Sequence, residues 1–315
     1  MRFAVSPMWE VVSGFRLLRS GSAHPVHLPW TRQVRPRIAA AGLEGGWLSE
    51  LVPVSGYAPD FLNPAPKGPG PALAEELAAI TATPADRVRH DLDHLRYHQG
   101  RLGPRLQALY AQPHARLGQV AQEIETYWNL ALAPYWARVQ GVLDADVFHR
   151  TRQFAEHGAA HLFNHLHPSV SWDDNALRLV RRQRTLSRDT AGSGLLLVPS
   201  VFKGPGLSTR VAPPDPPQLA YPARGTGSLW HPRATAATAA LTAVLGRTRT
   251  LLLTELHTPA STTELADRTR LSPARVSQCL TALRDAGLVS AHRAGRRVLY
   301  ARTAVGEALL TATTP

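Results

Sequence analysis

The stretch from Leu271 to Ala286, which reads LSPARVSQCLTALRDA, carries side chains that could read the edges of nucleic-acid bases. Arg275 is of the type that forms bidentate hydrogen bonds with guanine, and Gln278 is of the type that forms them with adenine. Helical spacing places both on one face, where short or polar neighbours would let a duplex approach closely. The other members of this base-reading face are Ser272, Pro273, Ala274, Ser277 and Thr281.

The helix that must position these side chains has start and stop signals. Ser272 is a favoured N-cap because its hydroxyl can accept a hydrogen bond from a first-turn amide. Pro273 suits the first helical position, where its missing N–H is not needed, and Gly287 can end the helix in left-handed backbone. Apolar residues at spacings of four and three form the opposite, inward stripe. These are Val276, Leu280 and Leu283.

Two further elements are expected on either side of this helix. A short helix over 264–268, capped by Thr262 or Thr263, comes before it, and the turn 269–271 completes a helix-turn-helix spacing. After it, strands over 288–291 and 298–302 form a hairpin around Gly295, here called the wing. Arginines at the tip suit contacts to phosphates or insertion into a narrow minor groove. They are Arg293, Arg296 and Arg297.

The segment TELADRTRLSPARVSQCLTALRDAGLVSAHRAGRRVLYART resembles the winged helix-turn-helix of ArsR/SmtB-type bacterial repressors. The likeness rests on ELA, LSPARVSQCL, LRDAGLV and GRRVLY, and it covers about the last quarter of the chain. MarR-like regulators share the layout. The resemblance implies a homodimer that binds a pseudo-palindromic operator, usually as a repressor. Carried over by position, the residues that would face the major groove are Ser272, Pro273, Ala274, Arg275, Ser277 and Gln278.

The resemblance does not extend to metal sensing. Metal-sensing members carry a cysteine pair at the start of the helix before the recognition helix, and the stretch HTPASTTELA has none. The expected C-terminal helix, residues 304–313, offers only Glu307 among the usual ligand types. We therefore expect no metal site in this region.

The N-terminal residues 1–232 show helical patterning first and strand patterning afterwards. Apolar residues at helical spacing run over 71–165, with Pro134 as an interruption, and alternation begins near residue 176. We expect an α+β domain with a small antiparallel sheet that senses a ligand or extends a dimer. The chain as a whole is then mainly α with small β sheets, with the winged helix-turn-helix in residues 233–315.

Three phrases in the N-terminal region carry a second resemblance. GLLLVPSVF and LAYPARG, followed by LW, are similar to an uncharacterised domain that precedes winged helices in some regulators of high-GC bacteria. The likeness covers about the first 230 residues. It supports the order of the two domains and implies no activity.

The charge of the chain favours an anionic partner. The net charge is +12, and nearly all basic residues are arginine. Residues 247–302 hold ten arginines and four acidic residues, a net charge of +6 and so half of the total. Nucleic acid is the usual partner of so basic a region. We see no signal peptide and no run of apolar residues that could span a membrane, so we expect a cytoplasmic protein.

Histidines at four-residue spacing form two triplets, and two histidines so spaced can share a metal ion. A metal or pH-sensing role is one interpretation, since histidine titrates near neutrality. The favoured interpretation is that these histidines occupy polar positions on amphipathic helices. The first triplet is His90, His94 and His98, and the second, on another helix, is His157, His161 and His165.

Two other features have a functional and a simpler interpretation. Cys279, the only cysteine, could be a redox switch, but a solitary cysteine beside Leu280 is more often a small buried apolar residue. The run Arg178–Arg184 could bind nucleic acid, but a solvated strand face is the favoured explanation.

Together these patterns predict a homodimeric DNA-binding transcriptional regulator that acts as a repressor. The expected partners are double-stranded DNA, a second copy of the chain and an unknown small-molecule effector, without a cofactor. The sequence shows no phosphate-binding glycine loop and no catalytic set, so we expect no enzyme. The alternative is a protein-interaction winged helix attached to a ligand-binding or enzymatic N-terminal module.

Overall fold

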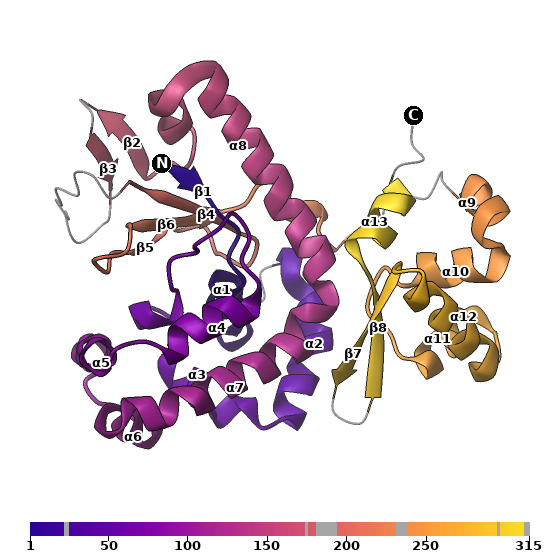
Figure 1. Ribbon diagram of the computed structural model, residues 1–315, viewed down its shortest axis with the longest axis horizontal. Coiled ribbons are helices and arrows are strands. Elements are labelled where there is room, and N and C mark those ends of the chain that lie inside the picture. The colour runs from indigo at the N-terminus through magenta and orange to yellow at the C-terminus, as the bar shows by residue number, and fades with distance from the viewer. Residues whose placement is uncertain (22–24, 174–175, 181–193, 231–237, 295–296, 312–315) are drawn as a thin grey trace. The chain divides into compact units, whose positions relative to one another are not determined.

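The structure, a computed structural model, describes residues 1–21, 25–173, 176–180, 194–230, 238–294 and 297–311 (Figure 1). It is mainly helical with small sheets, so the fold class expected from the sequence is confirmed. Among the residues described, no helix combines the length and the apolar character that crossing a membrane requires.

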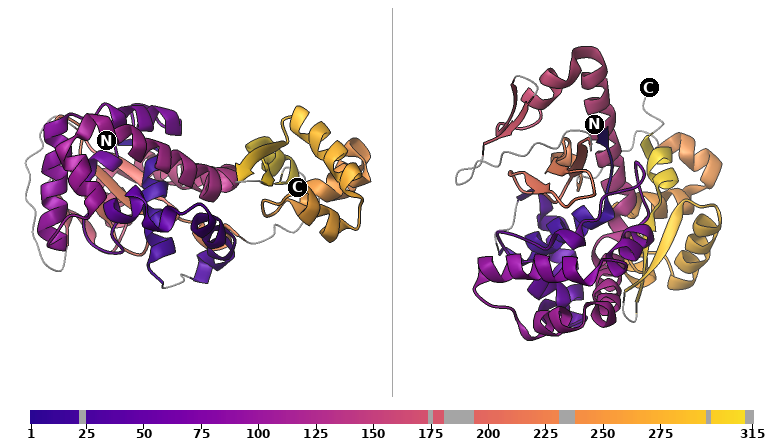
Figure 2. Two further views of the ribbon diagram at one scale, coloured as in Figure 1. Left: turned by 90° about the horizontal axis from the view of Figure 1, so that it is seen from below. Right: turned by 60° about the vertical axis from the view of Figure 1, so that its left-hand side comes forward.

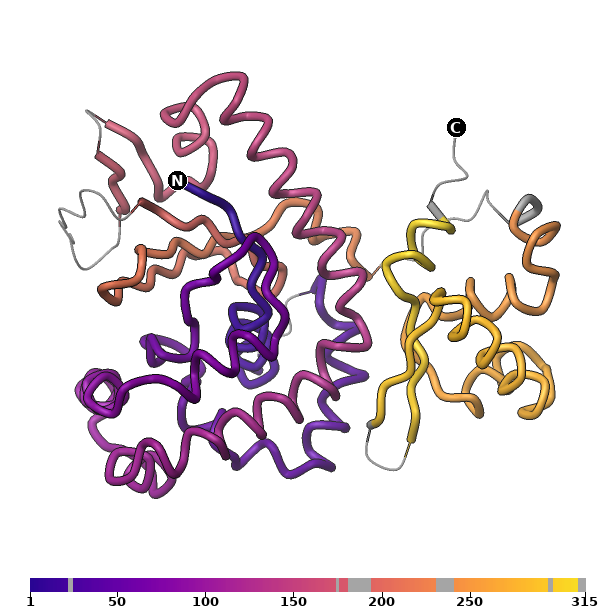
Figure 3. The backbone as a smooth tube through the Cα atoms, in the orientation of Figure 1, coloured from indigo at the N-terminus to yellow at the C-terminus, as the bar shows by residue number. Residues whose placement is uncertain are grey.

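The chain forms two compact units, each built from separate segments that can be followed along the tube in Figure 3. The first unit comprises residues 1–24, 45–122 and 142–226. The second comprises residues 25–44, 123–141 and 227–315. Two N-terminal segments therefore belong to the same unit as the C-terminal region. A domain boundary near residue 232 stays a prediction.

Helices in the N-terminal region begin where local signals place them. α1 (Pro7–Arg19) starts after Ser6, whose hydroxyl accepts a hydrogen bond from the Trp9 N–H at 3.3 Å. Pro134 lies in the short 3-10 turn η4 (Ala133–Tyr135) and interrupts the helical run, as expected. The other helices are α2 (Leu28–Ala40), α3 (Trp47–Leu51), α4 (Leu73–Thr81), α5 (Ala85–Gln99), α6 (Pro104–Ala111), α7 (Pro113–Ala131) and α8 (Trp136–Asn164).

The main sheet of the first unit has the strand order β1-β4-β6-β5. Its central strand β4 (Leu196–Ser200) pairs in parallel with both β1 (Arg2–Phe3) and β6 (Gln218–Pro222). Only β5 (Ser208–Arg210) runs antiparallel, against β6. The strands lie among the helices of the first unit in both views of Figure 2.

The prediction of an antiparallel sheet is therefore wrong for the main sheet. Every residue of β4 is buried, as in parallel strands that are covered on both faces, and such strands carry no alternation. The alternating pattern near residue 176 belongs to a separate antiparallel pair of strands, β2 (Val170–Asp173) and β3 (Ala176–Leu179). The alternation of apolar and polar residues thus marks strands of the smaller sheet and not of the main one.

Two buried carboxyl groups connect segments of the first unit. Glu10 in α1 accepts hydrogen bonds from the N–H groups of Val201 and Phe202, at 2.9 and 3.2 Å, just after β4. Glu76 in α4 accepts from the Ser6 hydroxyl at 2.6 Å and from the Met8 N–H at 2.8 Å, at the start of α1. Burial raises the pKa of each carboxyl to about 7.

The C-terminal part of the second unit packs helices against a two-stranded hairpin. Its core is formed by apolar residues of every helix and of both strands, including Leu253, Leu265, Leu280 and Leu310. The elements are α9 (Thr238–Leu245), α10 (Arg247–Glu255), α11 (Thr262–Thr269), α12 (Pro273–Asp285), β7 (Val289–Ala294), β8 (Arg297–Arg302) and α13 (Ala304–Thr311).

Candidate nucleic-acid interface

Helices α11 and α12 form the expected helix-turn-helix. The cap of α11 is Ser261 and not Thr262 or Thr263, because Ser261 forms a capping box with Glu264. The Ser261 hydroxyl accepts from the Glu264 N–H at 3.3 Å, and the Glu264 carboxylate accepts from the Ser261 N–H at 2.8 Å. Arg270 ends α11 in left-handed backbone, with φ 59°, which turns the chain sharply toward α12.

Helix α12 begins and ends as the sequence predicts. The Ser272 hydroxyl accepts a hydrogen bond from the Arg275 N–H at 3.3 Å, and Pro273 is the first helical residue. Gly287 follows the helix with φ +70°, and the next N–H donates back to the Leu283 carbonyl at 2.9 Å. The stripe Val276, Cys279, Leu280 and Leu283 is buried in the core.

The other face of α12 is open to solvent. The structure brings the base-reading residues together there, since every one of them is exposed. Their types and exposure meet the requirement for major-groove contacts, while their part in binding remains a prediction. These residues are Ser272, Pro273, Ala274, Arg275, Ser277, Gln278 and Thr281.

The wing is a longer hairpin than the sequence suggests, since β7 and β8 stay paired as far as Ala294 and Arg297. Both described tip arginines, Arg293 and Arg297, are exposed, whereas Arg296 lies outside the described residues. Arg293 pairs with Val298, one register step from the pair that holds Arg297. Successive pairs point to opposite faces, so the wing has an arginine on each face. Such a hairpin has the geometry to contact the phosphates on both sides of a minor groove.

The base of the wing is tightly packed around Gly306. A Cβ atom on Gly306 would lie 2.3 Å from the Leu288 carbonyl oxygen, which is backbone and cannot swing away. Thr303 holds the same region, because its hydroxyl donates to the Gly287 carbonyl at 2.7 Å and accepts from the Gly306 N–H at 3.1 Å.

Gly306→Ala should therefore destabilise the C-terminal region by about 1–3 kcal/mol, the usual range for overpacking. Urea unfolding followed by circular dichroism would measure this loss. Gly118→Ala is the matched control, because Gly118 lies in α7 with nothing within 4 Å of an added Cβ. There the added methyl should be neutral or stabilise the helix. Equal effects of the two changes would contradict this account of the wing base.

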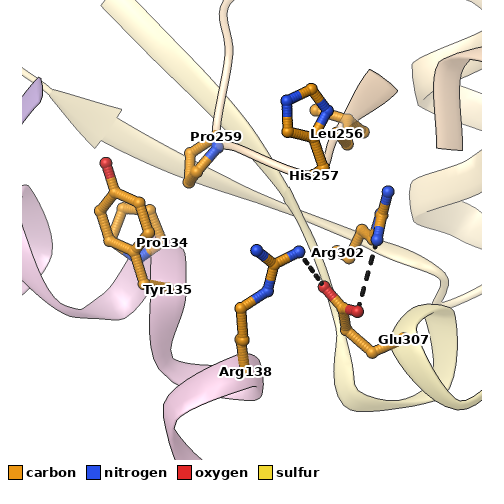
Figure 4. Close-up of a pocket in the computed structure, with 8 residues that line it drawn as sticks. All are labelled: Pro134, Tyr135, Arg138, Leu256, His257, Pro259, Arg302 and Glu307. Atoms are coloured by element: carbon orange, nitrogen blue, oxygen red, sulfur yellow. Dashed lines mark hydrogen bonds and ion pairs between the residues drawn. The ribbon is translucent and has the colours of Figure 1, made fainter. Parts of the chain in front are cut away.

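A small ion cluster lies at the wing base, within the second unit (Figure 4). Glu307 of α13 pairs with Arg138 of α8 at 3.0 Å and with Arg302 of β8 at 3.3 Å. Arg302 also donates to the carbonyls of Leu253 and Thr254 in α10. The adjacent cavity has a volume of about 10 Å³, the space of one water molecule.

Arg302 is a residue whose role the sequence does not reveal beyond its place in the wing strand. Two features of the sequence could have indicated this role. Arg302 lies at the buried end of a strand, and an acidic residue follows closely in the next helix. A buried guanidinium needs such a partner. The cluster is thus structural, and it fixes where the wing and α13 meet.

Cys279 lies in the core of the C-terminal region, with 6% of its surface exposed. It contacts the apolar side of α12 and is turned away from the base-reading face. The structure places it as a small buried apolar residue, and a thiol so covered is poorly accessible to oxidants.

The first histidine triplet lies along the exposed face of α5. The ring centroids of His90 and His94 are 5.7 Å apart, those of His94 and His98 are 5.9 Å apart, and Tyr57 contacts the latter two. In the part of the chain that the structure describes, no group of three or more His, Cys, Asp or Glu is arranged to hold a metal ion.

The second triplet does not share one regular helix, which corrects the expectation. Gly158 has φ 80° and ψ 179°, so α8 kinks there, and the helix ends at Asn164. His157 precedes the kink and His165 follows the last helical residue, although the His161 and His165 rings stack at 4.1 Å. Desolvation, His165 and His157 together lower the pKa of His161.

The basic run Arg178–Arg184 is described only at its start. Arg178 is exposed on β3 and pairs with Asp173 of the neighbouring strand at 2.9 Å. The contact is that of a solvated strand face. The arginines of this run after residue 180 lie outside the described residues.

Comparison with known proteins gives two matches along the chain. Residues 250–291 match the family described as "Bacterial regulatory protein, arsR family". The matched stretch includes α11, α12 and the start of the wing. Residues 99–227 match a family of unknown function, DUF5937. No curated protein and no solved structure matches the chain.

Both resemblances noted in the sequence are thereby confirmed. The regulatory match indicates DNA binding and transcription regulation, and it points away from catalysis for this region. The other match brings no activity with it. The chain carries an arsR-family helix-turn-helix domain at its C-terminal end, preceded by a domain of unknown function.

Proposed function

We propose that the protein is a homodimeric transcriptional repressor that binds a pseudo-palindromic operator through α12 and the wing. The observation that carries this proposal is the face of α12, on which Arg275 and Gln278 are exposed among short side chains. A duplex can approach such a face closely enough for base contacts. The wing arginines would hold the phosphates beside the reading helix.

Exposed apolar side chains on the flanking helices support the homodimer. Val244 of α9 is 81% exposed and Val305 of α13 is 59% exposed. Leu251 of α10 is also exposed. A second copy of the chain would remove these side chains from water, and sedimentation of the free protein reports the oligomeric state.

An effector that acts on the N-terminal region is also part of the proposal. In the first unit, an open hollow of about 600 Å³ is lined by Arg96, Arg101 and the start of α6. Two arginines at such a place would favour a small anionic molecule.

Arg275→Ala should weaken binding to the upstream intergenic DNA by about 1–3 kcal/mol and relax the preference at one base position. Fluorescence anisotropy at two salt concentrations, on the intergenic duplex and on a scrambled duplex, measures both effects. Arg275→Lys is the matched control, since it keeps the charge and loses the planar fork. If Arg275 reads a base, the lysine variant loses sequence preference as the alanine variant does.

The protein-interaction alternative gives a different result. Wild-type binding would then be weak, equal on scrambled DNA and unchanged in Arg275→Ala. Contacts to phosphate make affinity fall steeply with salt, whereas an apolar protein interface is much less sensitive. The exposed face of α12 is polar and basic, which favours DNA over a protein partner.

A further inference from the structure

Helix α2 is a basic helix of the N-terminal region. It carries Arg32, Arg35 and Arg37, and residues 25–43 contain no Asp or Glu. Arg32 and Arg35 are exposed, while the opposite side of the helix is buried through Trp30, Val34 and Ile38. The apolar side fastens the helix, and the arginines give its other side a positive charge.

Hydrogen bonds attach α2 to the segment around η4. The Trp30 indole N–H donates to the Ala131 carbonyl at 2.8 Å. The Tyr135 hydroxyl donates to the Gln33 side-chain oxygen at 2.8 Å. Tyr135 is almost fully buried, and Arg37 interacts with its hydroxyl as well. The helix is thus anchored to this segment through several side chains.

The segment around η4 is in turn packed against the wing. Residues of η4 contact both β7 and β8. One turn further along the chain, Arg138 forms its ion pair with Glu307 at 3.0 Å. Helix α2, η4 and the wing therefore belong to one compact unit, although α2 precedes the wing by more than 200 residues in the sequence.

We propose that α2 is a second DNA-contacting element, which binds backbone phosphates next to the wing without reading sequence. This inference rests on the proposed function and extends it. Exposed arginines on a helix that contains no Asp or Glu attract phosphate, and the packing through η4 keeps this helix in the same compact unit as the wing, the element expected to enter the groove. Arg32 and Arg35 are the residues assigned to this contact.

The test compares salt dependence in the full-length protein. The slope of log K against log salt is negative. In the double variant Arg32→Gln with Arg35→Gln, its magnitude should decrease by about 0.9 for each phosphate that is no longer neutralised. Its affinity should fall equally on intergenic and scrambled duplexes. The difference between the double variant and the wild type should become smaller on shorter duplexes that end at the wing, because these lack the phosphates assigned to α2. Arg224→Gln, at an exposed arginine of the first unit, controls for the loss of charge and should leave the slope unchanged.

An unchanged slope in the folded double variant, with Arg275→Ala still weakening binding, would overturn the α2 contact and leave the proposed function intact. If the double variant has a slope of smaller magnitude, but the wild type shows no sequence preference, the result would support the α2 contact and reject base reading. Absence of any DNA binding would overturn both. Circular dichroism melting shows whether the variants are folded, and the glutamines keep the helix polar and unbroken.

Discussion

Raising the pH from about 4.5 to about 7 is expected to reduce the free energy of unfolding by about 3 kcal/mol for each of the buried carboxyls Glu10 and Glu76. Both have a pKa raised from 4.5 to about 7 in the folded chain, and burial is the main cause. Hydrogen bonds from Val201 and Phe202 to Glu10 act in the opposite direction, but they do not compensate for the lost hydration.

The direction follows from proton binding. Between pH 4.5 and 7 the folded protein keeps protons on these two carboxyls, whereas the unfolded chain has released them. The folded state therefore binds more protons, and its stability falls as the pH rises through this window. Below pH 4.5 both states are protonated and this contribution no longer changes.

Urea unfolding at several pH values would measure this dependence, and carboxyl ¹³C shifts would report the two pKa values directly. Glu10→Gln and Glu76→Gln should each remove part of the slope, because an amide does not titrate. Glu125→Gln is the matched control, since Glu125 is an exposed glutamate on α7. Slopes that stay the same in all three variants, or carboxyl pKa values near 4.5, would show that these side chains are better solvated than the structure implies.

The helix-turn-helix could be predicted because its signals are local. Ser272, Pro273 and Gly287 mark the ends of α12 within a few residues of the sites they affect, and the apolar stripe lies within the helix itself. The cap of α11 lies at Ser261, one residue before the first of the two predicted threonines. Ser261 competes with two adjacent threonines for that role, and only the reciprocal bond to Glu264 decides among them.

The sheet and the position of α2 could not be predicted because they depend on contacts between distant segments. β1 has two residues, Arg2 and Phe3, and it becomes a strand through pairing with Leu196 and Leu197. Burial on both faces removes the alternation that would mark β4. Likewise, the role proposed for Arg32 and Arg35 of α2 depends on the contact between Gln33 and Tyr135, which the sequence does not show.

Glu307→Ala is expected to destabilise the C-terminal region by about 3 kcal/mol or more, the second large effect. The substitution leaves two guanidinium groups without their shared carboxylate, and Arg302 and Arg138 are only 6% and 15% exposed. Removing one partner of a buried pair costs more than the pair contributes, because the remaining charge stays out of water. Glu307→Gln, which still accepts a hydrogen bond, should lose less.

A double-mutant cycle isolates the interaction. Arg138→Met removes one charge and keeps a long apolar side chain, so the loss caused by Glu307→Ala should be smaller in that background, with a coupling energy of about 0.5–3 kcal/mol. Arg152 and Glu156 form an exposed ion pair at 2.7 Å in α8, and Glu156→Ala should have little effect on stability, because water and salt screen such a pair. Additive losses at Arg138 and Glu307, as for unrelated surface sites, would contradict the ion cluster. Coupling well above that of the surface pair would establish that α8, β8 and α13 are held together by one buried carboxylate.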